Sequence, residues 1–94
     1  MLINNAFYTM HTDRLAEAEA QLHQLRDASR SEPGCLTFNV GRSVDNPNVF
    51  ILYEEYRDRD ALDAHFASEH FQRLVVDGIR KLALERIGYH CKAI

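Results

Sequence analysis

Residues 49–57, which read VFILYEEYR, restrict the fold of this chain more than any other segment. Their β-branched and aromatic residues predict a strand, and successive side chains of a strand point to opposite faces. Apolar side chains fall on both faces, with Phe50, Leu52 and Tyr56 on one and Val49, Ile51 and Tyr53 on the other. The sheet that contains this strand therefore needs cover on both sides.

A second strand is predicted just before this one. In residues 35–42, CLTFNVGR, the apolar residues Leu36, Phe38 and Val40 alternate with other residues, as in a strand. Residues 45–48, Asp-Asn-Pro-Asn, have the composition of a turn. The two strands therefore form a hairpin.

A strand and a helix are predicted ahead of the hairpin. Residues 2–10 have strand composition, and Thr12 or Asp13 can cap a helix that runs to about Arg30. Pro33 and Gly34 end this helix, since glycine readily adopts positive φ. Its apolar stripe consists of Leu15, Ala18, Leu22 and Leu25.

A helix and a strand follow the hairpin. Asp60 begins the helix, and Ser68 offers a second cap, so the helix is predicted to break there. A second amphipathic segment of about ten residues and a closing strand over residues 83–92 complete the chain. The stripe of the second segment consists of Phe71, Leu74, Val75, Ile79 and Leu82.

This order of elements, βαββαβ, predicts one α+β domain over residues 1–94 with a ferredoxin-like fold. In that fold a four-stranded antiparallel sheet has both helices on one face. A second copy of the chain, packed sheet to sheet, is the simplest cover for the other face, so we expect a homodimer.

Charge and composition exclude several classes of partner. Eleven Lys and Arg against fourteen Asp and Glu give a net charge of −3, and no basic run could follow a nucleic acid backbone. No segment has the length of apolar sequence that spans a membrane, and we expect a cytoplasmic protein. Cys35 and Cys91 are expected to be reduced core residues.

Sequence motifs for common cofactors are missing. The four glycines cannot form GxGxxG or a P-loop, and GxSxG does not occur. The five histidines contain neither an i, i+4 pair nor HExxH, so we predict no metal site and no cofactor.

Glu54 and His65 are the candidate acid–base residues. Strand alternation places Glu54 among apolar side chains, where burial raises the pKa of an unpaired carboxyl and suits it to proton transfer. His65 lies on the apolar face of the second helix and could share this role. The alternative is structural: Glu54 pairs with Arg42 or His65, and neither residue touches a substrate.

Three passages together resemble the antibiotic biosynthesis monooxygenase family. They are SEPGCLTFNV at 31–40, FILYEEY at 50–56 and DALDAHFASEHFQ at 60–72, and the resemblance covers nearly the whole chain. It implies a dimeric α+β barrel with a cavity between the sheet and the helices of each subunit. It also implies an oxygenase that attacks polycyclic phenols or quinols with dioxygen, without flavin, metal or another prosthetic group.

The resemblance assigns site residues by position. His65, Glu54 and Tyr56 are the expected catalytic residues, although many relatives have Trp at the position of Tyr56. The expected substrate-binding residues are Asn4, Phe38, Leu52, Phe66, His70 and Phe71. Because Asn4 and Asn5 are adjacent in a strand, one of them faces inward.

Two other functions stay open. The same stretches are similar to the isomerase that processes a phosphorylated quorum-sensing autoinducer, in which protons are moved and nothing is oxidised. Such a substrate needs a convergent basic residue, for which Arg42, Arg57 and Arg73 are only loosely placed. The second alternative is a dimer that binds an apolar ligand without catalysis.

Overall fold

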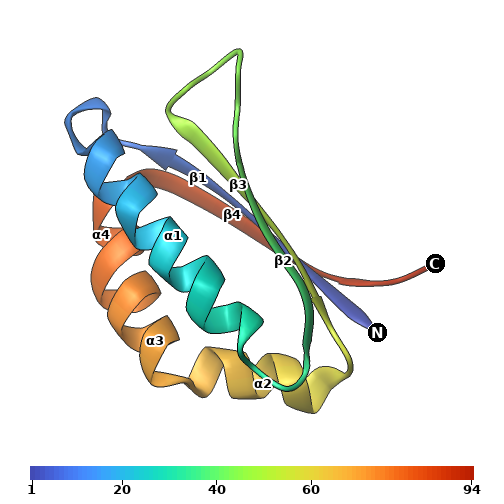
Figure 1. Ribbon diagram of the computed structural model, residues 1–94. Helices are drawn as coiled ribbons and strands as arrows, with labels where there is room; N and C mark the ends of the chain where they lie inside the picture. Colours follow the sequence, from blue (N-terminus) through green and yellow to red (C-terminus); the bar gives the residue numbers. More distant parts are fainter.

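The computed structural model describes all residues from 1 to 94 and confirms the predicted order of elements (Figure 1). The strands are β1 (Leu2–Met10), β2 (Cys35–Arg42), β3 (Val49–Tyr56) and β4 (Ala83–Lys92). The helices are the 3₁₀ turn η1 (Thr12–Arg14), α1 (Leu15–Arg30), α2 (Arg59–Ala67), α3 (Glu69–Phe71), the π-helical η2 (Gln72–Ile79) and α4 (Arg80–Leu82). α3, η2 and α4 follow one another without a break in the chain.

The sheet has the strand order β2-β3-β1-β4, and every neighbouring pair is antiparallel. This is the predicted ferredoxin-like α+β fold. The register places side chains in rows across the sheet, and three of these rows matter for the site. From β2 to β4 the rows are Phe38-Glu54-Asn4-His90, then Val40-Leu52-Ala6-Gly88, then Arg42-Phe50-Tyr8-Arg86.

The helices lie on one face of the sheet, and the core fills the space between (Figure 1). The predicted stripe residues of α1 and of the last helical segment join this core. The other face of the sheet carries apolar side chains without cover, as the pattern of β3 predicts. Ile51 and Tyr53 are each 38% exposed, and Ile87 and Tyr89 of β4 are 44% and 59% exposed.

Two of the predicted helix caps are wrong. Neither Thr12 nor Asp13 caps α1, because both lie in the 3₁₀ turn η1 that precedes it. Helix α2 is capped by Asp58 rather than Asp60: the Asp58 carboxylate accepts the N–H of Ala61 at 2.8 Å. The cap at Ser68 is confirmed, since its Oγ accepts the N–H of Phe71 at 3.2 Å.

The glycine after α1 has a different role from the one predicted. No residue of the chain has positive φ. Instead, a Cβ at Gly34 would lie 2.3 Å from the Cβ of Ala61, so glycine is needed because the turn packs directly against α2.

The cysteines are free, but they are half-buried rather than core residues. Burial raises the pKa of the Cys35 thiol to about 11, which leaves it protonated and unreactive at neutral pH. No helix of the structure is both long enough and apolar enough to cross a membrane.

Candidate functional site

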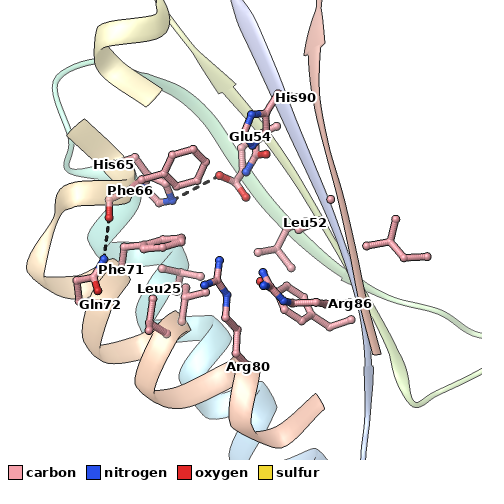
Figure 2. Close-up of a pocket in the computed structure, with 17 residues that line it drawn as sticks. Leu25, Leu52, Glu54, His65, Phe66, Phe71, Gln72, Arg80, Arg86 and His90 are labelled. Carbon is pink, nitrogen blue, oxygen red and sulfur yellow. Dashed lines mark hydrogen bonds and ion pairs between the residues drawn. The ribbon is translucent and has the colours of Figure 1, made fainter. Parts of the chain in front are cut away.

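A cavity of about 610 Å³ lies between the inner face of the sheet and the helices (Figure 2). This volume is within the range of small-molecule sites. Nine of its seventeen lining residues are hydrophobic. The lining consists of Asn4, Ala6, Tyr8, Leu25, Leu52, Glu54, His65, Phe66, Phe71, Gln72, Val75, Val76, Arg80, Arg86, Ile87, Gly88 and His90.

Glu54 is the carboxylate of the cavity and is only 2% exposed. The hydroxyl of Tyr56 donates a hydrogen bond to Glu54 Oε1 at 2.7 Å. Burial raises the pKa of Glu54, although His65, Tyr56 and Asn4 oppose the rise by stabilising the charged form. Glu54 is therefore a carboxyl group able to gain or lose a proton closer to neutral pH than an exposed one.

His65 faces Glu54 from α2 and is 1% exposed. Its Nε2 lies 3.6 Å from Glu54 Oε1, which is longer than a direct hydrogen bond (Figure 2). The ring packs among aromatic side chains, with centroid distances of 5.2 Å to both Tyr56 and Phe71. This packing fixes the imidazole with one nitrogen directed at the carboxylate of the cavity.

Glu32 holds the other nitrogen of this ring. His65 Nδ1 lies 2.9 Å from Glu32 Oε2, and His70 Nε2 bonds to the same oxygen. Burial acts to raise the pKa of Glu32, but its hydrogen bonds and charge interactions with His65 and His70 outweigh this and lower it. Because an ionised carboxylate only accepts hydrogen bonds, His65 donates from Nδ1, and its Nε2 is free to accept a proton.

The sequence profile of the antibiotic biosynthesis monooxygenase family matches residues 1–76, about four fifths of the chain. The chain belongs to this family. A crystal structure of an antibiotic biosynthesis monooxygenase superimposes on it with a TM-score of 0.93 at 29% identity, covering 100% of this chain and 99% of the other.

The chain is also similar to two further proteins. YcnE of Bacillus subtilis, provisionally named a monooxygenase, is 26% identical over 83% of this chain and 82% of its own length. The uncharacterized protein sll1783 of Synechocystis is 35% identical over 67% of this chain. That match spans 43% of the Synechocystis protein, so this chain corresponds to less than half of it.

The structure brings most of the site residues expected for this monooxygenase family to the cavity. Asn4, Leu52, Glu54, His65, Phe66 and Phe71 all line it. Tyr56, Phe38 and His70 do not line it. Tyr56 and Phe38 are buried behind Glu54 and His65, and His70 is bound to Glu32 on the other side of the ring. Asn4 is the inward-facing asparagine, whereas Asn5 is on the outer face beside Cys91.

Sequence reasoning missed two parts of the site. Glu32 was interpreted only as part of the turn that ends α1, although the resemblance to the monooxygenase family includes it in the quoted SEPG passage. The basic residues of the cavity are Arg80 and Arg86. The three arginines considered from the sequence instead pair with carboxylates elsewhere: Arg42 with Glu19, Arg57 with Asp58 and Arg73 with Glu69.

The same histidines form a group that could ligate a metal. One ligand atom from each of Glu32, His65 and His70 lies within 4.8 Å of the others. Two imidazoles and a carboxylate are donors that zinc and other divalent transition metals accept. The sequence predicts no such site, because these three residues come together only when α2 and α3 pack against the turn after α1.

Proposed function

We propose that the protein is a cofactor-independent monooxygenase that oxidises a small aromatic quinol or polyphenol directly with dioxygen. The main support is the environment of His65: Nδ1 is held by the Glu32 carboxylate, while Nε2 faces Glu54 and a cavity about half of whose lining residues are hydrophobic. This arrangement supplies a positioned base next to space for a flat ring. Membership of the antibiotic biosynthesis monooxygenase family supports the same reaction class.

The first step of the proposed reaction is the removal of a phenolic proton. The gap of 3.6 Å between His65 Nε2 and Glu54 Oε1 leaves both atoms able to bond to a hydroxyl of the substrate. His65 accepts the proton at Nε2, and the Glu32 carboxylate stabilises the imidazolium that forms. Tyr56, which donates to Glu54, keeps the second carboxylate in position.

The second step is attack on dioxygen by the electron-rich phenolate. The phenolate transfers electrons to dioxygen and forms a C–O bond at a ring carbon ortho or para to its oxygen that carries a hydrogen. The O–O bond then breaks while this carbon loses its hydrogen as a proton. One oxygen atom stays on the ring as a carbonyl and the other leaves as water, so a phenol and dioxygen give a quinone and water. The hydrophobic residues of the lining offer a surface for the ring system of the substrate.

Dioxygen uptake tests this proposal. Chelator-treated protein and a panel of quinols and anthrones are followed with an oxygen electrode. We expect turnover, and a loss of about 10²–10⁴-fold for His65→Ala, which is the usual contribution of a general base. His23→Ala, which removes an exposed histidine of α1, is the matched control and should keep full activity. No uptake with any substrate, or equal rates for His65→Ala and the unaltered protein, would overturn the proposal.

An isomerase is the second candidate, and Arg80 and Arg86 in the cavity are the observation that favours it. Guanidinium groups bind phosphate well, so a phosphorylated sugar derivative could enter the same site. His65 and Glu54 would then move a proton between neighbouring carbons, and dioxygen would not be consumed. Turnover of a phosphorylated ketose under nitrogen distinguishes this reaction from the monooxygenase.

We also propose that a second copy of the chain covers the outer face of the sheet. Ile51 and Tyr53 of β3 and Ile87 and Tyr89 of β4 lie exposed on one face, and burying such a surface is favourable. Light scattering should give twice the chain mass of 10.9 kDa, and Ile51→Asp should give the monomer mass. Val44→Asp, at an exposed site in the hairpin loop, should stay dimeric. A monomer for the unaltered protein would refute this arrangement.

A further inference from the structure

Two arginines reach into the cavity beside the part that holds Glu54 and His65. Figure 2 shows Arg80 extending from α4 and Arg86 from β4 toward the same part of the cavity, which we call the arginine end. Arg86 lies in the row of Tyr8, and Glu54 lies in the row of Asn4. These rows are four residues apart along β1, or about 13 Å. The ring of Phe71 contacts both His65 and Arg80, so the arginine end and the base are neighbouring parts of one cavity.

These two arginines differ from the other seven in the chain. Six of the seven form ion pairs with Asp or Glu, and Arg30 donates to the carbonyl of Phe38 and to the side-chain oxygen of Asn39. No carboxylate lies within ion-pairing distance of Arg80 or Arg86. The cavity thus holds two guanidinium cations that the protein does not neutralise.

Arg80 is held in place in a way that favours an incoming anion. Its Nε is buried and has no hydrogen-bond partner, which is an unfavourable state for a charged donor. Its Cζ lies 5.5 Å above the ring of Phe71, so the guanidinium is fixed by an aromatic face. An anion in the cavity would lie beside a guanidinium group that is already positioned.

Tyr8 adds a neutral donor at the arginine end. It is 6% exposed, and burial raises the pKa of its hydroxyl, although Arg80 opposes the rise. Tyr8 therefore stays protonated at neutral pH and does not neutralise the arginines. Together the three side chains offer several N–H and O–H groups and no anion.

We propose that the substrate carries a carboxylate or a phosphate monoester that binds between Arg80 and Arg86, while its reacting hydroxyl lies at Glu54 and His65. This inference rests on the proposed function for the position of the reacting group. The arginines set the orientation, because an anion is more favourable beside two unpaired guanidinium groups than beside the buried carboxyl group of Glu54. The substrate class is then a hydroxylated aromatic or similar flat molecule with an anionic group at the far side of its ring system.

Binding under nitrogen tests this proposal without any turnover. The probes are a naphthol and a hydroxynaphthoate whose hydroxyl and carboxylate lie at opposite ends of the rings, measured by calorimetry. We expect the hydroxynaphthoate to bind at least about tenfold more tightly, which is the usual effect of one charge-assisted hydrogen bond. Arg86→Gln and Arg80→Gln should each remove about tenfold from this preference, measured for each variant as the ratio of its two affinities. Arg73→Gln, on the same helical segment but paired with Glu69 at the surface, should leave both affinities unchanged.

Equal affinities for the two probes, or a preference that survives both arginine substitutions, would overturn the proposal. Arg86 is an exposed strand residue, so its substitution keeps the test valid if Arg80→Gln does not fold. A comparison of the affinities of naphthyl phosphate and naphthoate identifies the anion. The compound that binds more tightly carries the group that the arginine end selects. Acid-selective binding without dioxygen uptake would support the anion site and refute the monooxygenase. Dioxygen uptake with neutral quinols, without tighter binding of the acid, would refute the anion site and support the monooxygenase.

Discussion

Replacing Glu32 by Gln should reduce both activity and stability, because this carboxylate receives hydrogen bonds from two histidines. The structure allows the size of the effect on stability to be worked out. A hydrogen bond to a charged group contributes about 1.5–3 kcal/mol and a neutral one about 0.5–1.5 kcal/mol, so each bond weakens by about 1 kcal/mol. Glu32 bonds to His65 and to His70, and its side chain is 16% exposed, so screening by water is limited.

We therefore expect Glu32→Gln to lower the free energy of unfolding by about 1–2 kcal/mol at pH 7, or the Tm by roughly 4–15 °C. The dependence on pH follows from the lowered pKa of Glu32. A carboxyl group with a lowered pKa in the folded state stabilises the fold above the pKa of the unfolded chain, and this stability is lost as the pH falls through the folded value. The difference between variant and unaltered protein should thus shrink in acid, below the ordinary value of 4.5.

Urea denaturation at pH 7 and at several acidic pH values measures this difference. Turnover at pH 7 should fall by about 10–100-fold, because His65 loses the charge that orients it. Glu17→Gln, which breaks an exposed ion pair with Arg14, is the control and should change neither property appreciably. A loss of stability that is the same at every pH would refute the reasoning, since it would mean that Glu32 acts by packing and not by charge.

Three further predictions concern burial, close packing and capping. Glu54→Gln should gain stability relative to the unaltered protein as the pH rises above the ordinary value of 4.5, because the raised pKa of Glu54 makes its stabilising contribution fall as the pH rises. Urea titrations that show no such trend would contradict this. Gly34→Ala should lower the Tm, because its Cβ would lie 2.3 Å from that of Ala61. Adding Ala61→Gly should restore much of the lost Tm. A double variant that is no more stable than Gly34→Ala alone would count against direct contact. Ser68→Ala should cost about 1 kcal/mol by removing the cap of the last helical segment, and an unchanged midpoint in urea would show that this cap is dispensable.

The elements of the fold follow from local patterns, which explains why the sequence predicts them well. The β3 segment predicts apolar side chains on both faces of the sheet, and Ile51 and Tyr53 do lie on its outer face, where they are exposed. The break at Ser68 depends on one side chain and its nearest backbone, so it is also predictable. The cap of α2 was misplaced by two residues because Asp58 and Asp60 are chemically equal candidates, and only the path of the chain after β3 selects between them.

The site residues also divide into those that the sequence predicts and those that it does not. Glu54 could be found from the sequence because the alternation of a strand fixes which neighbours share its face. Glu32 and Arg80 could not, because each gains its role from segments far away along the chain. Glu32 meets His65 and His70 across more than thirty residues, and Arg80 reaches the cavity from the end of a π-helical segment, whose spacing differs from the α-helical period used to interpret the sequence.

The sequence by itself therefore determined the order βαββαβ, the two-sided apolar sheet and the buried position of Glu54, since these depend on periodicity and on residue type. Only the tertiary structure decided which nitrogen of His65 faces the cavity and that two unpaired arginines line the same cavity. Those features depend on distances between elements that are remote in the chain. Such distances arise from the packing of helices on the sheet, and the hydrophobic pattern of each element fixes which face is buried but not which side chains meet there.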